Sequence, residues 1–245
     1  MRIRKNTYHA TGRKIFLDVG SNMGMGFAEC APIWDVDSTW EIFAFEANPH
    51  SIKYYQENIE SNRYDVLKDK KITLINKAVW DEDEDGELPF RPEKVSETYY
   101  NKDKKWAAWC DNLNEGYKLG NNLDFIDFNI PTTGGSLPGV LYDKLSDKKK
   151  YAENLVYEEA ILVECIDFSQ WVKESFSKND YIIMKMDIEG FEYKVLPKMI
   201  KDNTIQYVDE LIIEWHNGMV LGYEDLDAKL KKEIRDLGVV VQDWY

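Results

Sequence analysis

Residues 15–26 read Ile-Phe-Leu-Asp-Val-Gly-Ser-Asn-Met-Gly-Met-Gly, an apolar strand followed by a glycine-rich turn. A helix-compatible run, residues 27–30, comes directly after the turn. Glycine lets the backbone approach a ligand closely, and a helix N-terminus presents free N–H groups. The stretch therefore predicts a cradle for a small ligand, although a tight strand-to-helix turn without any ligand would show the same pattern.

The spacing of this turn departs from the dinucleotide fingerprint G-x-G-x-x-G. Glycines stand at 20, 24 and 26, and Asn22 occupies the place of the second glycine. Asp18, two residues before the first glycine, would repel a pyrophosphate but attract an ammonium group. S-adenosylmethionine carries an ammonium and a sulfonium. The turn therefore favours S-adenosylmethionine over NAD as its ligand.

A second acid follows the next predicted strand, residues 41–45. Glu46 stands 22 residues beyond Gly24, where a carboxylate can accept both hydroxyls of an adenosine ribose. A solvated acid at a strand end is the alternative interpretation. The ribose role does not separate NAD from S-adenosylmethionine, since both contain this ribose. After Glu46, Asn48 and Pro49 predict the N-terminus of a helix over about 49–62.

Strands and helices alternate along most of the chain, which predicts right-handed crossovers and an α/β fold with a mostly parallel, twisted sheet. We expect helices on both faces, as in Rossmann-like proteins. The remaining predicted strands cover residues 71–79, 160–166, 181–186, 210–216 and 239–244. Residues 86–159 show no convincing periodicity and are rich in aromatic side chains. We expect them to be an insertion of short strands and turns that caps the ligand-binding edge of a single domain spanning residues 1–245.

Composition excludes several classes of protein. The net charge of −14 argues against a general nucleic-acid binder, because phosphate recognition needs a basic surface. The sequence contains no apolar run of 18 residues, so we predict no transmembrane span. Three widely spaced cysteines indicate neither a disulfide framework nor a zinc site, and favour a reducing compartment. The cytoplasm is therefore the expected location.

Four predicted strands end in ionisable residues. In an open parallel sheet, ligands bind beyond the carboxyl ends of the strands. Each such residue is weak evidence alone, but four strand ends converging on one edge predict a site. The residues concerned are Asp18, Glu46, the pair Asp187 and Glu189, and the pair Glu214 and His216.

These strand ends also resemble the FkbM family of S-adenosylmethionine-dependent methyltransferases. The matching runs are residues 16–24, 44–49, 76–79, 184–190 and 213–216, of which Lys-Met-Asp-Ile-Glu-Gly at 185–190 is the most specific. The resemblance implies a class I methyltransferase sheet and O-methylation of hydroxyls, often on sugars, glycans or polyketides. It also implies cofactor contacts from Asp18, Gly20, Ser21, Asn22, Gly24, Glu46, Ala47, Ala78 and Asp187. The chain departs from the family in its long aromatic insertion and in ending one strand after the last helix, which leaves the usual closing antiparallel hairpin incomplete.

Methyl transfer to an alcohol is an in-line displacement in which the hydroxyl loses its proton. A general base must therefore lie within about 3 Å of the oxygen, unless a metal lowers the pKa of the hydroxyl. Asp187, Glu189 and His216 are the candidate catalytic residues, and His216 suits the task best by its unperturbed pKa, near 6.5. Asp187 could equally position the acceptor or bind the cofactor, with Lys185 as its partner on the same strand face. His216 could instead be a buried structural histidine.

Although Asp187 and Glu189 could bind a cation, the sequence holds no ligand-spaced motif, and we predict no metal site. The leading hypothesis is thus an S-adenosylmethionine-dependent O-methyltransferase whose acceptor is a small molecule or glycan, most plausibly a carbohydrate. A nicotinamide-dependent oxidoreductase and a non-catalytic module that keeps the cofactor fold are the alternatives. The sequence leaves the oligomeric state open.

Overall fold

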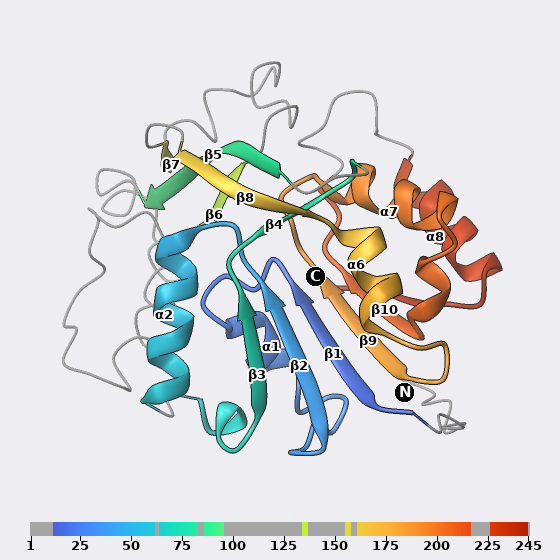
Figure 1. The fold of residues 1–245 in the computed structure, drawn as a ribbon, viewed down its shortest axis with the longest axis horizontal. Helices are drawn as coiled ribbons and strands as arrows, with labels where there is room; N and C mark the ends of the chain where they lie inside the picture. The colour runs from blue at the N-terminus through green and yellow to red at the C-terminus, as the bar shows by residue number, and fades with distance from the viewer. Residues whose placement is uncertain are drawn as a thin grey trace.

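The computed structural model describes residues 12–61, 64–82, 86–95, 134–136, 155–157, 161–216 and 226–244. Its main sheet has six strands in the order β11-β10-β9-β1-β2-β3, and every pairing is parallel. The strands are β1 (Lys14–Val19), β2 (Trp40–Phe45), β3 (Lys71–Ile75), β9 (Tyr181–Met186), β10 (Glu210–Ile213) and β11 (Val240–Asp243). Figure 1 shows them side by side, with helices on both faces. The α/β, Rossmann-like fold predicted from the sequence is confirmed.

Strand β1 lies at the centre of this sheet, and the chain order reverses on either side of it. Val19, its last residue, stands in register with Phe45 of β2 and Met186 of β9, and Met186 in turn pairs with Ile213 of β10. The carboxyl ends of four strands therefore lie at one level. A crevice opens where strand order reverses in such sheets, so the residues after these strands are brought to one place.

Alternation along the strands divides the core into two layers. Ile15, Leu17 and Met184 face one side, where they pack with residues of α6, α7 and α8. Phe16 and Ile183 face the other side, towards α1 and α2. Burial on both faces explains why these strands read as nearly continuous apolar runs.

The helix predicted over about 49–62 is observed over residues 49–60. The chain contains α1 (Met25–Cys30), α2 (Pro49–Glu60), α6 (Phe168–Ser175), α7 (Glu192–Lys201) and α8 (Leu226–Asp236), with short 3-10 turns η1 (Asp65–Leu67) and η3 (Ile205–Tyr207). Asn48 caps α2, its side chain accepting from the backbone N–H of His50 at 3.0 Å. Asp167 caps α6 in the same way through Gln170. The helix α7 continues through Pro197. No helix in the described ranges has the length and apolarity to cross a bilayer.

The predicted strand 71–79 is two strands, which corrects the sequence reading. β3 ends at Ile75, and β4 (Ala78–Trp80) joins a second sheet with β8 (Ile161–Asp167), β5 (Gly86–Val95) and β6 (Gly134–Ser136), while β7 (Leu155–Tyr157) pairs with β5. Between β3 and β4 the Asn76 amide donates to the carbonyls of Glu46 and Ala47 at 2.7 and 3.2 Å. These bonds turn the chain out of the main sheet.

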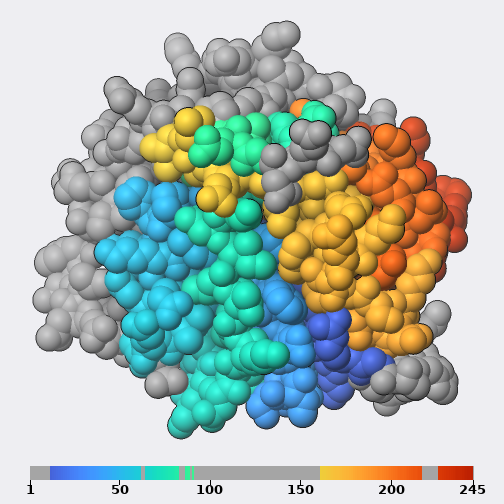
Figure 2. All heavy atoms as spheres, in the orientation of Figure 1, coloured from blue at the N-terminus to red at the C-terminus, as the bar shows by residue number. Residues whose placement is uncertain are grey.

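The second sheet lies across the upper end of the main sheet (Figure 1), and its green and yellow atoms form a band above α2 and β3 in Figure 2. The described parts of the predicted insertion, 86–95, 134–136 and 155–157, are strands of ten, three and three residues. The aromatic residues from Tyr99 to Phe128 lie outside the described residues. β11 forms one edge of the main sheet and runs parallel to its neighbour β10. The main sheet as described therefore has no closing antiparallel hairpin.

A substitution at Gly20 would test how tightly the turn after β1 is packed. Its φ is +76°, and a Cβ added there would lie 1.7 Å from the carbonyl oxygen of Asp187, which is backbone and cannot rotate away. We expect Gly20→Ala to lower the free energy of unfolding by about 3–5 kcal/mol. Gly238 is the matched control, since its φ is +96° but a Cβ there would meet nothing within 4 Å. Gly238→Ala should cost only about 1–2 kcal/mol. Urea denaturation of both variants checks the difference, and equal losses would contradict it.

Candidate active site

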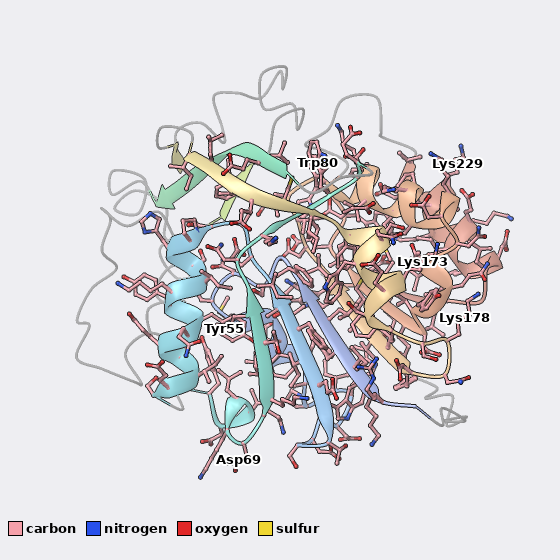
Figure 3. All side chains as sticks on the ribbon, viewed as in Figure 1. Tyr55, Asp69, Trp80, Lys173, Lys178 and Lys229 are labelled. Atoms are coloured by element: carbon pink, nitrogen blue, oxygen red, sulfur yellow. The ribbon has the colours of Figure 1, made fainter. Side chains whose placement is uncertain are left out.

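The glycine-rich turn after β1 folds back onto β2. The backbone N–H groups of Gly20 and Ser21 both donate to the carbonyl of Phe45, at 3.0 and 2.9 Å. Gly24 then begins α1 with φ +87°, and its Cα faces the ring of Tyr55, which a Cβ would meet at 2.3 Å. Tyr55 is fully buried on α2 (Figure 3). The glycines are therefore required by close packing of the turn as well as by backbone conformation.

Glu46 joins this turn to the next one. One carboxylate oxygen accepts the N–H of Asn22 and the other accepts the N–H of Asn48, both at 2.7 Å. Burial raises the pKa of Glu46 to about 7, although the two backbone hydrogen bonds oppose the rise. Each oxygen has a further lone pair, so the carboxylate can still accept two hydrogen bonds from a ligand.

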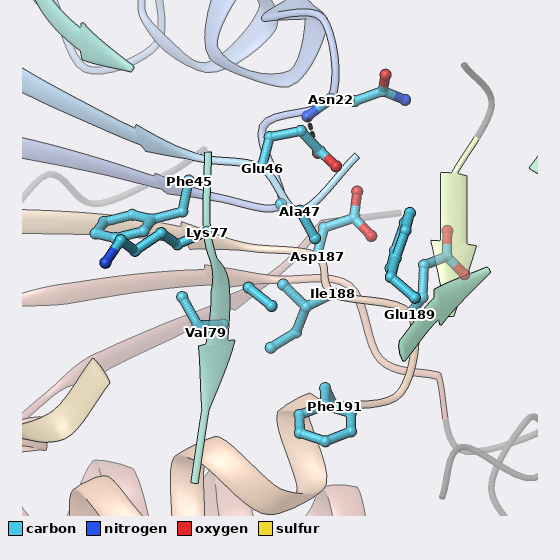
Figure 4. Close-up of a pocket in the computed structure, with 13 residues that line it drawn as sticks. Asn22, Phe45, Glu46, Ala47, Lys77, Val79, Asp187, Ile188, Glu189 and Phe191 are labelled. Carbon is cyan, nitrogen blue, oxygen red and sulfur yellow. Dashed lines mark hydrogen bonds between the residues drawn. The ribbon is translucent and has the colours of Figure 1, made fainter. Parts of the chain in front are cut away.

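A cavity opens beside these turns, with about 650 Å³ of empty space that is partly open to solvent. Figure 4 shows the residues around it, which come from the ends of β1, β2 and β9 and from β4 and β5. Seven residues that the sequence singled out line this cavity, namely Gly20, Asn22, Glu46, Ala47, Ala78, Asp187 and Glu189. The apolar part of the wall is formed by Phe45, Val79, Phe90, Ile188 and Phe191. Three of the six predicted strand-end residues, Glu46, Asp187 and Glu189, therefore meet at this cavity.

Asp18 is not among the lining residues. It is the fifth residue of β1, in register with Ala44 and Lys185, and its side chain is fully buried. Burial raises its pKa to about 6, against the opposing charge of Lys185. The ammonium that this carboxylate meets in the structure is Lys185 Nζ, at 3.7 Å. Contact between Asp18 and a ligand ammonium stays a prediction. Ser21 and Gly24 also lie off the cavity lining.

Lys185 ties the ends of β1 and β9 together. Its buried Nζ donates to the carbonyl of Gly20 at 2.8 Å and to Asp187 Oδ2 at 3.2 Å, which confirms its predicted pairing with Asp187. Nζ also lies 4.4 Å from the centre of the Trp244 ring. Burial lowers the pKa of Lys185, but the charges of Asp187 and Asp18 outweigh that effect and the pKa is raised. Lys185 therefore stays positively charged beneath the glycine-rich turn.

His216 lies behind the cavity wall and is only 6 % exposed. Its Nδ1 lies 3.0 Å from Glu192 Oε1, and its Nε2 lies 3.8 Å from carboxylate oxygens of both Asp187 and Glu189. Burial lowers the pKa of His216, but the hydrogen bond to Glu192 and the charges of Glu192, Glu189 and Asp187 outweigh it and raise the pKa to about 10. The unperturbed pKa therefore no longer argues for His216 as general base, because a raised pKa favours the protonated imidazole, which cannot accept a proton. A catalytic role for His216 stays a prediction.

The carboxylates around His216 also raise the question of whether this cluster could bind a metal ion. One ligand-type atom from each of Asp187, Glu214 and His216 lies within 4.8 Å of the others. A cation there would have to displace the imidazole proton, because only the neutral ring can donate its electron pair to a metal. We keep the prediction that this chain has no metal site.

The model of the Methyltransferase FkbM domain matches residues 18–238 of this chain, which includes every strand end around the cavity. The chain belongs to the FkbM methyltransferase family. No curated protein sequence and no solved structure gives a significant match. Because a methyltransferase requires a methyl donor and an acceptor, the cavity at the strand ends is the candidate place for both.

Two residues that support the methyltransferase site were not predicted from the sequence. Glu192, two residues after Gly190, is fully buried and binds both His216 and the turn before it. Asn76 secures Glu46 and Ala47 through their carbonyls. A second acid so soon after the Asp-Ile-Glu-Gly run was a visible signal for Glu192. Asn76 begins the family-like run 76–79, but that run did not predict its contacts, since these depend on where the chain leaves the sheet.

The raised pKa of Glu46 predicts a pH dependence of stability. Between pH of about 4.5 and 7 the folded chain holds a proton on Glu46 that the unfolded chain has lost. The free energy of unfolding should therefore fall as the pH rises through this window, by up to about 3 kcal/mol from this group. Glu46→Gln should flatten the slope, whatever its absolute stability, and Glu41→Gln on the same strand should not. Urea denaturation at several pH values measures the slope. Equal slopes for Glu46→Gln and the unmodified protein would contradict the prediction.

Proposed function

We propose that this methyltransferase takes its methyl group from S-adenosylmethionine and transfers it to a hydroxyl of a sugar or glycan. The observation that carries the proposal is the cavity itself. It is lined by the Glu46 carboxylate and the glycine-rich turn, and also by the carboxylates of Asp187 and Glu189. The first group suits a nucleoside-containing cofactor, and the second suits an acceptor that must lose a proton.

Unpaired polar atoms in the turn support the fit of this cofactor. Ser21 Oγ and Asn22 Oδ1 are buried and have no hydrogen-bond partner among the described residues. Buried polar atoms are normally paired. Of these two residues only Asn22 lines the cavity, so Asn22 Oδ1 is the atom that a ligand there could use. Asn22 Oδ1 is an acceptor, as the binding of an ammonium requires.

Glu46 has the geometry expected for ribose binding. Its two oxygens are held by the N–H groups of Asn22 and Asn48, so the carboxylate cannot rotate. Two neighbouring hydroxyls of a ribose could donate to the remaining lone pairs. Ala47 and Ala78, both small, line the cavity beside it and leave room for a flat ring.

When bound, S-adenosylmethionine supplies a methyl group on a positively charged sulfur. In the proposed reaction Asp187 accepts the proton of the acceptor hydroxyl. Its side chain is 23 % exposed, lines the cavity and is oriented by Lys185 Nζ at 3.2 Å. Glu189, 33 % exposed, lies on the same side and binds a neighbouring hydroxyl of the acceptor. The apolar walls exclude water, which strengthens the interactions of these charges.

A sugar fits this arrangement because it presents several hydroxyls to two adjacent carboxylates. The FkbM resemblance also points to hydroxyl acceptors of this class. We further propose that residues 1–245 act as one domain, with the insertion at about 86–159 on the acceptor side. Phe90 on β5 lines the cavity, which supports this placement of the insertion.

Removal of the Glu46 carboxylate tests the cofactor. We expect Glu46→Ala to weaken S-adenosylmethionine binding about 100-fold or more, because two charge-assisted hydrogen bonds are lost. Glu41→Ala is the matched control on the same strand, where Glu41 pairs with Arg13 and Lys71 away from the cavity. Isothermal titration calorimetry measures both, with NAD as a competing cofactor. Unchanged affinity in Glu46→Ala, or tighter binding of NAD than of S-adenosylmethionine, would overturn the assignment.

Neutralising Asp187 tests the chemical step. We expect Asp187→Asn to lower kcat by about 10²–10⁴-fold, the usual contribution of a general base, with cofactor affinity changed only a few-fold. The assay follows S-adenosylhomocysteine formation with a panel of sugars and glycans. Glu174→Gln is the control, since Glu174 is exposed on α6 and bonds to Gln170 of the same helix, and neither residue lines the cavity. A fully active Asp187→Asn would assign the base to another residue.

A further inference from the structure

Glu192 is a fully buried carboxylate that the proposed reaction does not use directly. It is the first residue of α7 and accepts three hydrogen bonds. Its Oε1 accepts from the N–H of Ile188 at 2.7 Å and lies 3.0 Å from His216 Nδ1, and its Oε2 accepts from the N–H of Gly190 at 2.8 Å. A buried charge is tolerated only when it is paired and hydrogen-bonded. These contacts give Glu192 both.

The hydrogen bonds from the N–H groups of Ile188 and Gly190 shape the turn that carries Glu189. Glu189 and Gly190 both adopt positive φ angles, +55° and +95°. For Glu189 this left-handed conformation is unfavourable, so the turn needs outside support. The Glu192 carboxylate supplies this support by accepting the N–H groups of Ile188 and Gly190. As a result Glu189 is held at the cavity wall, beside Asp187.

The hydrogen bond between Glu192 Oε1 and Nδ1 orients the imidazole of His216. With Nδ1 held by Glu192, Nε2 faces Asp187 Oδ1 at 3.8 Å, Glu189 Oε2 at 3.8 Å and Glu214 Oε1 at 4.0 Å. These distances exceed a hydrogen bond but allow strong charge interaction at a buried site. The carboxylates come from two segments: Asp187 and Glu189 from the turn between β9 and α7, and Glu214 from the end of β10.

Two further groups border this cluster in the described part of the chain. The Tyr193 phenol lies near the backbone of His216 and donates to Asp227 Oδ1 of α8 at 2.8 Å. Lys185 approaches Asp187 from the side of β1. The imidazole ring itself therefore faces carboxylates alone among the charged groups that the structure describes.

We propose that Glu192 is a positioning residue of the active site, which holds His216 as a cation among the strand-end carboxylates and fixes the turn that bears Glu189. Three carboxylates so close together repel one another, and one of them takes up a proton unless a cation compensates. The His216 cation, together with Lys185, offsets this repulsion around Asp187, the proposed acceptor of the hydroxyl proton. This catalytic role of the His216 cation rests on the proposed function, whereas the charge state of His216 does not depend on it.

The charge state can be measured directly, because the chain has only three histidines. We suggest NMR titration of the imidazole signals of the full chain from pH 5 to 11, with EDTA present, and assignment by His216→Gln. The pKa of His216 should lie near 10 in the unmodified protein. In Glu192→Gln the midpoint should fall by about one pH unit or more. Glu214→Gln is the matched control, and its shift should be smaller, because Glu214 lies farther away and is more exposed.

Several outcomes would overturn the inference. A midpoint for His216 below about 7.5 in the unmodified protein would show a neutral imidazole. Equal midpoints in Glu192→Gln and the unmodified protein would show that another group holds the proton. If Glu192→Gln fails to fold, the titration of the unmodified protein still decides, and Glu192→Asp, which keeps the charge, should restore a midpoint above that of free histidine.

The catalytic consequence has a separate readout. In Glu192→Gln, kcat at pH 8 should fall at least about tenfold, with S-adenosylmethionine affinity by calorimetry changed only a few-fold, and Glu192→Asp should recover part of the rate. An unchanged kcat would overturn the positioning role. Failure of the unmodified protein to bind S-adenosylmethionine would overturn the proposed function alone, since the titration of His216 needs no cofactor.

Discussion

The buried ammonium of Lys185 is the interaction on which the candidate site depends. A lone ammonium in a protein interior is strongly unfavourable, and here it is compensated by Asp18, Asp187, the carbonyl of Gly20 and the face of Trp244. These partners come from β1, the turn after it, the end of β9 and the segment after β11. The four must converge on Nζ together, so Lys185 fixes the glycine-rich turn relative to Asp187.

Around this cation the strand ends carry an excess of negative charge. Asp187, Glu189, Glu192 and Glu214 gather round His216, and the pKa of His216 rises to about 10 in response. The cluster therefore creates its own counter-charge by protonating a histidine. The same excess favours a positively charged methyl donor in the neighbouring cavity, as the proposed cofactor is. Charge balance thus links the buried network to the proposed chemistry.

Most of the main sheet was predictable because its strands are buried on both faces and flanked by clear turn signals. β1, β2 and β9 appear in the sequence as apolar runs that end in polar residues. The break between β3 and β4 was missed, because periodicity shows that a segment is extended but not which sheet it joins. The side chain of Asn76, bonded to carbonyls about 30 residues away in sequence, decides that. The pairing of β8 with β4 and β5 was hidden for the same reason.

The sequence by itself determined the order of the elements, the glycine-rich turn, the acid after each central strand and the family. These features are local, because each depends on a few consecutive residues and their spacing. The tertiary structure alone decided which acids face the cavity and which are buried: it places Glu46 and Asp187 at the cavity and Asp18 beneath it. It also decided the charge of His216. A pKa depends on burial and on neighbours brought together by folding, and Glu192, 24 residues away in sequence, is a neighbour that only the fold supplies.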